Sequence, residues 1–353
     1  MVGVPRMPPG WAAGLVDRVR AGLARMHRGM APPPVRVLEG VLGMLDLGAL
    51  GALCALDIPD RLERPTTAAD LARSVDADPA MVQRVLTYAG ARGWVRVDRR
   101  GRVSPTRTTA FLRRDHPGGW RAWVEFASGS EVVAAVGRLA VEPRAADAFA
   151  AANGAPFFDW CLDHPDRHAA FDAAMAAGGR LHGLALAAAL DWSGSSRVCD
   201  VGGGTGALLG CLLDREPHLH GVLVDLPAVV DRAPDRPRLE VVGTDAFVGL
   251  PEGCDSYLLV NVLHDWDDER AVTLLRNVER ARAPGGRAVV VEGERRLLPL
   301  DSITARADLL MLALTAGGRE RTTQEFARLA GEAGLRLERT IRLPTGDRAH
   351  VLR

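Results

Sequence analysis

Apolar and polar positions in the second half of the chain alternate between short runs typical of buried strands and longer segments with helical spacing. The apolar runs predict strands at residues 197–201, 221–225, 239–243, 256–260 and 287–292. Strands and helices that alternate in this way predict a parallel sheet covered by helices on both faces. Two further runs, 336–343 and 350–353, are separated only by residues 344–347, and so short a turn predicts an antiparallel hairpin at the end of the sheet.

The first half of the chain shows helical spacing instead. Residues 1–32 are rich in proline, glycine and arginine, and they predict a loose arm with one short helix near Trp11–Met26. Helices are predicted from Val35 to about Leu56, from a capping box at 67–70 and from the Asp78-Pro79 cap. A short hairpin of residues 94–98 and 102–104 follows. This order of helix, helix, helix and hairpin predicts a winged-helix domain.

The patterns divide the chain into four predicted parts. These are a flexible N-terminal arm (1–32), a winged-helix domain (33–106), a helical linker region that contributes to a ligand pocket (107–180) and an α/β domain (181–353). A length of 353 residues favours more than one domain.

The composition is that of a globular protein, with 47% hydrophobic and 25% charged residues. The 44 basic and 44 acidic residues cancel, so we expect no general attraction to nucleic acid or to an anionic membrane. The five cysteines lie singly in apolar contexts, which predicts reduced core residues of a cytoplasmic protein. The apolar stretch Val41–Ile58 contains Asp46 and Asp57, so we expect no membrane span. The first residues do not have the charged-then-apolar pattern of an export leader, so we expect no export.

A winged helix is also typical of DNA-binding proteins, so its charge matters. Residues 34–102 hold ten arginines and nine acidic residues. The predicted recognition helix presents only Arg84 and Arg92 outward, too few to neutralise a track of phosphates. The Leu- and Val-rich first helix favours pairing with a second copy of the chain. We therefore predict a homodimerisation domain, with a DNA-binding regulator as the alternative.

The most informative motif is Asp200–Gly206, which reads Asp-Val-Gly-Gly-Gly-Thr-Gly and ends the first predicted strand of the sheet. Glycines let the backbone approach a ligand closely. Asp225 ends the next strand, where an acidic residue receives the ribose hydroxyls of a nucleoside. The last glycine comes one residue earlier than in the dinucleotide fingerprint, which suits a nucleoside without a pyrophosphate. We expect a nucleoside cofactor here, and a plain strand-to-helix turn is the alternative.

Further polar residues lie where strands end, the edge at which an open parallel sheet binds its ligand. Asp245 and Phe247 follow the third strand and suit an adenine ring, although Asp245 has a helix cap as its alternative role. His264 follows the fourth strand and could serve as a base near neutral pH or as a structural residue. Glu292 or Glu320 could hold its imidazole in one tautomer. A surface ion pair with a neighbouring arginine is the alternative for Glu320.

Together these motifs resemble the S-adenosylmethionine-dependent O-methyltransferases of the caffeic acid and hydroxyindole type, which include bacterial natural-product enzymes. The resemblance runs from about residue 33 to the end, and its most specific parts are 200–206, 225–227, 261–268 and 317–322. It implies an α/β fold with a Rossmann-like class I methyltransferase domain, whose parallel sheet ends in a reversed strand. It also implies an N-terminal α-helical winged-helix dimerisation domain, S-adenosylmethionine as the cofactor, and no metal.

The resemblance implies roles for individual residues as well. His264 is the implied catalytic base, flanked by Glu292 and Glu320. The residues expected to bind the cofactor are Asp200, Gly202, Gly203, Gly204, Asp225, Leu226, Asp245, Ala246, Phe247 and Asn261. The residues expected to bind the acceptor are Phe158, Met175, Asp265, Met311 and Thr315. Two positions depart from related enzymes: Val260 stands in place of a lysine near the adenine, and residues 176–179 lack a serine used on the cofactor.

The expected reaction is methyl transfer from S-adenosylmethionine to a hydroxyl of an aromatic acceptor, such as a phenolic polyketide or a related secondary metabolite of antibiotic biosynthesis. The expected partners are this small acceptor and a second copy of the chain, with no nucleic acid and no membrane. A cofactor-binding relative with other chemistry, such as hydroxylation, and a winged-helix transcriptional regulator are the alternatives.

Overall fold

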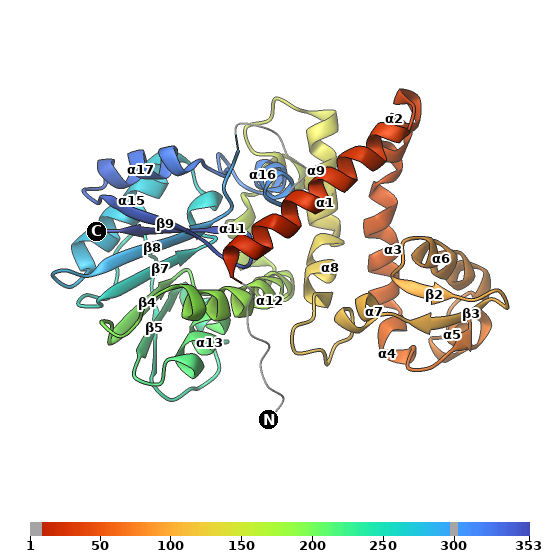
Figure 1. Cartoon of the computed structure of the whole chain (residues 1–353), viewed down its shortest axis with the longest axis horizontal. Coiled ribbons are helices and arrows are strands. Elements are labelled where there is room, and N and C mark those ends of the chain that lie inside the picture. Colours follow the sequence, from red (N-terminus) through yellow and green to blue (C-terminus); the bar gives the residue numbers. More distant parts are fainter. Residues whose placement is uncertain (1–8, 297–302) are drawn as a thin grey trace. The chain divides into compact units, whose positions relative to one another are not determined.

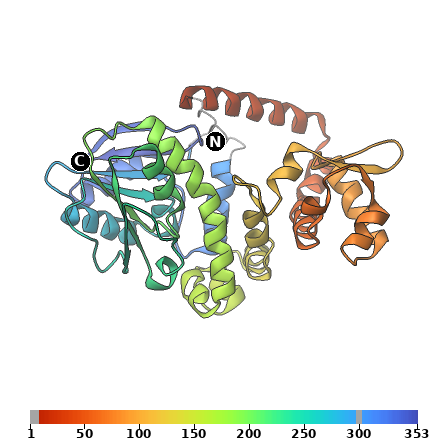
Figure 2. The same cartoon turned by 90° about the horizontal axis from the view of Figure 1, so that it is seen from below.

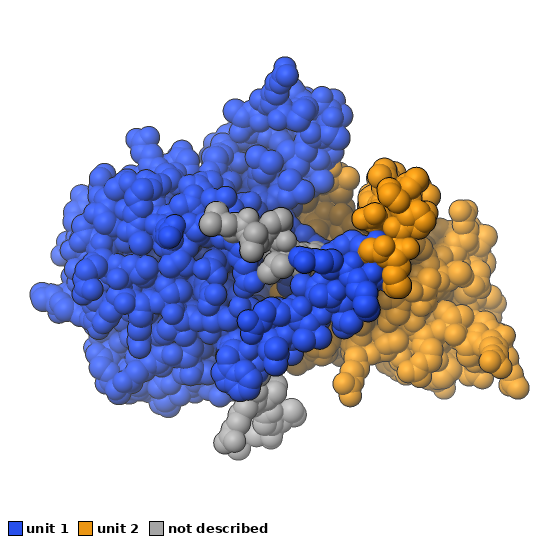
Figure 3. Space-filling view, turned by 45° about the horizontal axis from the view of Figure 1, so that its top comes forward, with its two compact units in different colours: residues 1–28, 134–165, 178–353 blue, residues 29–133, 166–177 orange. Residues whose placement is uncertain are grey.

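The structure, a computed structural model, describes residues 9–296 and 303–353, and contacts divide the chain between two units (Figure 3). Unit 1 comprises residues 1–28, 134–165 and 178–353, and unit 2 comprises residues 29–133 and 166–177. This grouping differs from the four predicted parts, because residues 134–165 cluster with the C-terminal sheet and helix α12 (Pro165–Ala189) contributes to both units. Residues 1–8 of the predicted arm lie outside the described residues.

A seven-stranded sheet forms the centre of unit 1, with strand order β6-β5-β4-β7-β8-β10-β9. The strands are β4 (Arg197–Val201), β5 (His220–Asp225), β6 (Leu239–Gly243), β7 (Ser256–Val260), β8 (Arg287–Glu292), β9 (Leu337–Arg342) and β10 (Arg348–Leu352). Neighbours from β6 to β8 are parallel, whereas β10 is antiparallel to both β8 and β9. The predicted parallel sheet and reversed hairpin are confirmed. Strand β10 begins two residues before the predicted start, because Arg348 pairs with Glu292 of β8.

Alternating strand residues face two apolar layers. Ala288 and Val290 of β8 pack in a cluster with Leu275 of α15 (Asp268–Ala281) and Leu329 of α17 (Thr323–Glu332). The intervening residues of β8 pack instead with the C-terminal part of α12 and with α13 (Ala207–Arg215). Figures 1 and 2 show these helices on the two sides of the sheet. Burial on both faces explains why the parallel strands read as continuous apolar runs.

The strand order reverses at β4. The chain passes from β4 to β5 and β6 on one side of it, and then returns to β7 on the other. In an open parallel sheet, ligands bind at the carboxyl ends of the strands beside such a reversal. The glycine-rich loop after β4 and the loop after β7, which carries His264, both start at this edge.

Unit 1 contains further helices, most of them shorter than α1. They are α10 (Ala148–Asn153), α11 (Phe157–Asp163), α14 (Pro227–Val230), α16 (Ile303–Leu314) and the 3-10 turn η1 (Leu263–Asp265), and α9 (Ser130–Val141) begins in unit 2. Helix α1 (Gly10–Met30) has 21 residues and is longer than the predicted short helix. Apolar residues recur every three or four positions along it, and the composition of the segment obscured that spacing. Asp17 pairs with Arg342 of β9 at 3.0 Å, which ties α1 to the sheet.

Unit 2 combines helices with a small three-stranded sheet. Its helices are α2 (Pro33–Leu42), α3 (Met44–Ala55), α4 (Ile58–Arg61), α5 (Ala68–Ser74), α6 (Pro79–Ala91), α7 (Arg107–Phe111) and α8 (Arg121–Ala127). Antiparallel strands β1 (Thr66–Thr67), β3 (Arg102–Pro105) and β2 (Val95–Val97) pair in that order. The caps at Thr67 and Asp78 are confirmed, because each side chain accepts backbone N–H groups of the following turn. The single helix predicted from Val35 is wrong, since Gly43 interrupts it.

Residues 33–55 of unit 2 are long and apolar enough to cross a membrane when judged by length and composition, although only 11% of this stretch is buried. One such stretch is weak evidence, because core helices and signal sequences share these properties. The expected absence of a membrane span stays a prediction. All five cysteines are free, and four of them are buried.

Candidate active site

The glycine-rich loop joins β4 to α13 in a backbone conformation that requires glycine. Gly202, Gly204 and Gly206 have φ angles of 67°, 60° and 79°, which side chains rarely tolerate. Gly203 has no room for a side chain, because a Cβ atom would lie 2.6 Å from the Leu223 side chain and 2.7 Å from Asp200 Oδ2. The loop therefore presents bare backbone at the carboxyl edge of the sheet, as a closely bound nucleoside requires.

Two carboxylates flank this loop. Asp225 accepts hydrogen bonds from the backbone N–H groups of Gly204 (2.8 Å) and Leu226 (2.7 Å). These bonds fix the orientation of the Asp225 carboxylate at the carboxyl end of β5. Asp200 is buried, and its Oδ2 has no hydrogen-bond donor among the described residues. Burial and the negative charge of Asp225 raise the pKa of Asp200 to about 7. These features suit a ligand that brings hydrogen-bond donors or positive charge.

The loop after β6 has the features expected beside an adenine ring. Asp245 Oδ1 accepts the N–H of Phe247 at 2.8 Å, so this carboxylate caps its own turn and keeps its second oxygen for another donor. Asn277 of α15 donates to the carbonyls of Ala246 (2.7 Å) and Phe247 (3.0 Å) and so holds the loop in place. The sequence analysis missed Asn277. The available signal was a polar residue at a buried position of α15.

The imidazole of His264 lies among carboxylates that come from separate segments. Its Nδ1 is 3.2 Å from Glu320 Oε1, to which it is hydrogen bonded, and 3.2 Å from Glu292 Oε2. Its Nε2 is 3.6 Å from Asp265 Oδ1. Both glutamates are buried, so the alternative of a surface ion pair for Glu320 is wrong.

Glu292 also fixes the backbone that leads to His264. Its Oε1 accepts the N–H groups of Val262 (3.1 Å) and Leu263 (2.8 Å). Asn261 has a φ angle of 55°, a left-handed conformation that is uncommon without glycine, and its N–H donates to the carbonyl of Val291. The backbone at the start of the His264 turn is thus held in place by the end of β8.

Burial and charge act in opposite directions on the His264 cluster. Burial alone would lower the pKa of His264. The negative charges of Glu292, Asp265 and Glu320 outweigh it and raise this pKa to about 10. Burial raises the pKa of Glu292 to about 7 and that of Asp265 to about 6, although the charge of His264 opposes both changes. His264, Glu292 and Asp265 therefore influence one another's pKa values.

The side chains of His264, Glu292 and Glu320 also have donor types and spacing that could hold a metal ion. Their ligand atoms all lie within 4.8 Å of one another. The sequence-based expectation of no metal is therefore left as a prediction.

An aromatic group lies beside the His264 turn. The ring of Phe158 stacks on Trp266 with centroids 5.3 Å apart, and Trp266 meets Phe247 edge to face at 4.9 Å. Thr315 donates its hydroxyl to the Met311 carbonyl at 2.9 Å, and both side chains are buried. Trp266 was missed by the sequence analysis, although it lies two residues after His264.

Two predicted acceptor residues have different outcomes. Thr315 lies next to the His264 turn, because a Cβ atom on Gly318 would meet both Thr315 Oγ1 (2.1 Å) and the His264 carbonyl oxygen (2.6 Å). Met175 belongs to the part of α12 assigned to unit 2, so its predicted contact with the acceptor stays a prediction.

A nucleoside-binding loop and a histidine among buried carboxylates, at the reversal point of a parallel sheet, define an enzyme with a nucleoside cofactor. Sequence comparison identifies the class: the profile of the O-methyltransferase domain matches residues 137–336. The chain belongs to this family, and it is an S-adenosylmethionine-dependent O-methyltransferase.

Similar proteins include O-methyltransferases and one hydroxylase. The O-demethylpuromycin-O-methyltransferase of Streptomyces alboniger is 32% identical over 329 residues, covering 88% of this chain and 86% of its own. The aclacinomycin 10-hydroxylase RdmB of Streptomyces purpurascens is 37% identical over 292 residues, covering 78% and 77%. The crystal structure of NcsB1, an O-methyltransferase from neocarzinostatin biosynthesis, contains S-adenosylmethionine and 2-hydroxy-5-methyl naphthoic acid. It matches with a TM-score of 0.72 and 30% identity, covering 87% of this chain and 95% of that one.

Proposed function

We propose that this enzyme methylates a hydroxyl of an aromatic acceptor and that His264 is the general base. The observation that carries the proposal is the orientation of the imidazole. Nδ1 donates to Glu320 and lies beside Glu292, whereas Nε2 is turned away from both glutamates. A neutral imidazole that donates from Nδ1 keeps its lone pair on Nε2. Nε2 is therefore the atom that accepts the hydroxyl proton.

The carboxylates make His264 a strong base. A pKa of about 10 for His264 is close to the ordinary value of a phenol, about 10, so proton transfer between them is nearly balanced. An ordinary histidine, near pKa 6.5, would take the same proton at a cost of about 5 kcal/mol. At neutral pH the carboxylates also favour protonated His264, so the base must first lose that proton. When bound, the cofactor supplies a methyl group on a positively charged sulfur, and a nearby positive charge lowers the pKa of a histidine.

The cofactor site follows from the loop geometry. We assign the ribose hydroxyls to the carboxylate of Asp225, which lies at the end of β5 beside the glycine-rich loop. We assign the amino-acid end of the cofactor to Gly202–Gly204 and to Asp200 Oδ2, which has no hydrogen-bond donor among the described residues. Adenine is assigned to the wall formed by Asp245, Ala246 and Phe247. Leu226 and Asn261 complete the predicted set. Val260 and residues 176–179, where this sequence departs from related enzymes, are assigned no contact with the cofactor.

The aromatic acceptor is supported by the aromatic and apolar side chains beside the His264 turn. Phe158 and Trp266 stack with an interplanar angle of 23°, and they offer flat apolar surface beside the His264 turn. Met311 adds a flexible apolar side chain. The bound naphthoic acid in NcsB1 supports a phenolic acceptor of comparable flatness. We propose a phenolic polyketide or related secondary metabolite, with Met175 as a further wall.

We also propose that the N-terminal helices pair two copies of the chain and that residues 33–106 are a winged-helix dimerisation domain. The support is exposed apolar surface: the exposed fractions of Trp11, Val37 and Met44 are 72%, 69% and 74%. Burial between two copies would remove this surface from water. This pairing would explain why the stretch 33–55 is apolar in a protein that we propose to be cytoplasmic, with neither a membrane nor a nucleic acid as its partner. Val37→Asp combined with Leu38→Asp should give monomers by light scattering, and an unchanged dimer would argue against this interface.

The test of the base is His264→Ala. We expect its turnover number to fall about 10²- to 10⁴-fold, the usual contribution of general base catalysis, while the dissociation constant for the cofactor changes less than about twofold because no cofactor contact is assigned to this side chain. His220→Ala is the matched control, since His220 is an exposed histidine at the opposite end of the parallel strands. Full turnover in His264→Ala would show that another group takes the proton.

The relative that is a hydroxylase favours hydroxylation as a second candidate. Mass spectrometry of products from a panel of phenols distinguishes the two reactions, because methylation adds one carbon and two hydrogens and hydroxylation adds one oxygen. A gel shift at low salt tests the remaining alternative of a DNA-binding regulator. Binding of DNA at low micromolar protein would favour that alternative.

A further inference from the structure

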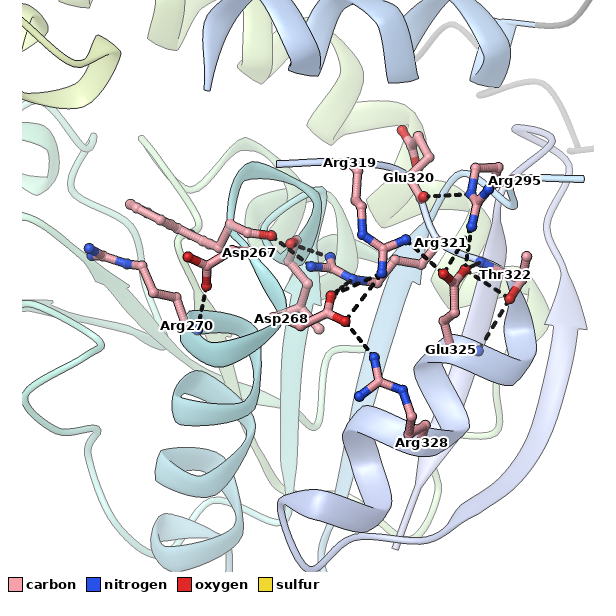
Figure 4. A network of polar contacts seen from close by, with 12 residues as sticks. Asp267, Asp268, Arg270, Arg295, Arg319, Glu320, Arg321, Thr322, Glu325 and Arg328 are labelled. Carbon is pink, nitrogen blue, oxygen red and sulfur yellow. Dashed lines mark hydrogen bonds and ion pairs between the residues drawn. The ribbon is translucent and has the colours of Figure 1, made fainter. Parts of the chain in front are cut away.

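Arg321 lies buried beneath the turn that carries His264. Its side chain is fully buried, and its guanidinium donates from Nη1 to the Leu263 carbonyl (2.7 Å) and from Nη2 to the Trp266 carbonyl (2.7 Å). Its Nε donates to Asp268 Oδ1 at 3.0 Å (Figure 4). Arg321 thus contacts backbone on both sides of His264 and the first residue of the following helix.

The turn needs such support because it is short. Residues Leu263–Asp265 form a single 3-10 turn, and so short a helix has poor internal hydrogen bonds. The Leu263 carbonyl accepts the Trp266 N–H at the long distance of 3.3 Å, and the Trp266 carbonyl lies just beyond the turn. Asn261, just before the turn, has a left-handed backbone, which persists only where the surrounding structure holds it. Arg321 adds a donor to the Leu263 carbonyl and one to the Trp266 carbonyl, and Glu292 accepts the N–H groups of Val262 and Leu263.

Arg321 and Glu320 act on the same turn from one segment. Arg321 forms a parallel bridge with Glu294, so the segment is extended, and consecutive side chains of an extended chain point to opposite sides. Glu320 contacts the imidazole of His264, whereas Arg321 contacts the backbone around it. Arg295 donates to the carbonyls of Arg321 (3.0 Å) and Glu320 (3.2 Å), which fixes the segment against the end of β8.

Asp268 anchors the guanidinium from the other side. It also accepts hydrogen bonds from Arg319 (3.1 and 3.2 Å) and from Arg328 of α17 (Figure 4). Burial would raise the pKa of Asp268, but Arg321 first, and then Arg328 and Arg319, lower it below its usual range. When Arg321 is replaced, Asp268 keeps Arg319 and Arg328 as cationic partners.

We propose that Arg321 is a positioning residue for methyl transfer, which sets the direction of His264 Nε2 by fixing the backbone on both sides of it. The inference rests on the proposed role of His264 as the base. A planar guanidinium satisfies acceptors in three fixed directions, whereas a lysine ammonium is a point charge on a flexible stem. Lysine therefore conserves the charge of Arg321 and loses its geometry.

The decisive variants are Arg321→Lys and Arg321→Ala, with Arg328→Ala as the matched control. Arg328 binds the same aspartate, is half exposed and makes no contact with the His264 turn in the described residues. We expect kcat to fall about 10²-fold in both Arg321 variants, the scale of a misplacement near 1 Å. The dissociation constant for S-adenosylhomocysteine should change less than about twofold. Low guanidinium concentrations should restore part of the activity of Arg321→Ala, and Arg328→Ala should keep wild-type kcat.

Wild-type kcat in Arg321→Lys would overturn the proposal. Parallel losses of kcat, cofactor affinity and thermal stability without rescue by guanidinium, or failure of both variants to fold, would assign Arg321 a structural role only and overturn it as well. The role of His264 is judged separately, by His264→Ala in the otherwise unchanged enzyme. Full turnover there would refute the proposed base whatever the Arg321 variants do.

Discussion

Replacing Glu320 with glutamine removes one negative charge from beside His264 and leaves an oxygen acceptor of the same shape. Glu320 Oε1 lies 3.2 Å from His264 Nδ1, and the carboxylate is buried. Coulomb's law at an effective dielectric constant of about 20 gives roughly 5 kcal/mol at this separation, which is an upper limit. Opposite charges this close shift a pKa by about 1–3 in practice. We therefore expect Glu320→Gln to lower the pKa of His264 by about 2.

The assay is kcat/KM as a function of pH. Only unprotonated His264 accepts a proton, so kcat/KM should rise with pH through the pKa of the free enzyme and level off above it. In the wild type that midpoint is expected near the His264 pKa of about 10. In Glu320→Gln it should move to about pH 8, with a lower plateau because the base is weaker. Glu294→Gln is the control, since Glu294 is a partly buried carboxylate paired with Arg348.

An unchanged midpoint in Glu320→Gln would refute the reasoning, because it would mean that Glu320 adds no charge to the environment of His264. An equal shift in Glu294→Gln would also refute it, because the effect would then not depend on contact with the imidazole.

Three further outcomes are expected. Asp225→Asn should weaken S-adenosylhomocysteine binding about 10- to 100-fold by calorimetry, because hydrogen bonds to a charged group contribute about 1.5–3 kcal/mol; unchanged affinity would remove Asp225 from the site. Gly203→Ala should weaken the same binding because its methyl group has no room, whereas Gly249→Ala, which has open space around it, should bind normally. Burial lowers the pKa of His350 to about 4, so the unfolded chain binds a proton between about pH 6.5 and 4 that the folded protein does not. As pH drops from about 7 to 4, the free energy of unfolding of the wild type should therefore fall by about 3 kcal/mol more than that of His350→Gln. Urea unfolding at both pH values measures this difference. Equal losses in the two proteins would contradict the lowered pKa of His350.

The elements of the sheet were predictable because each parallel strand is buried on both faces. Strands β4, β6, β7 and β8 have the predicted bounds, and the short turn before β10 predicted its reversed direction. The helix predicted near Trp11–Met26 is confirmed as α1, which extends from Gly10 to Met30. The single helix predicted from Val35 is wrong, because the interruption at Gly43 has no apolar signal and the pattern continues on both sides of it.

Candidate site residues were predictable where they lie at the end of a strand or just after it, since the carboxyl ends of parallel strands meet at one edge of the sheet. Asp200, Asp225 and His264 have this property. Asn277, Trp266 and Arg321 were missed as functional residues because they act through contacts that depend on packing. Asn277 lies inside a helix, and Arg321 lies next to a better candidate, Glu320, from which it points away.

By itself the sequence determined the order of strands and helices, the glycine loop and the residue types available at the ligand edge, because these depend on local spacing and backbone conformation. Only the tertiary structure decided which carboxylates meet His264. Glu292 and Glu320 are separated from it by 28 and 56 residues of sequence, and they meet it because β7 pairs with β8 and the extended segment 320–322 lies against residues 294–295. The same packing brings a buried guanidinium under the His264 turn. Burial then makes these charges strong, since water no longer screens them, and no property of the separate segments shows that effect.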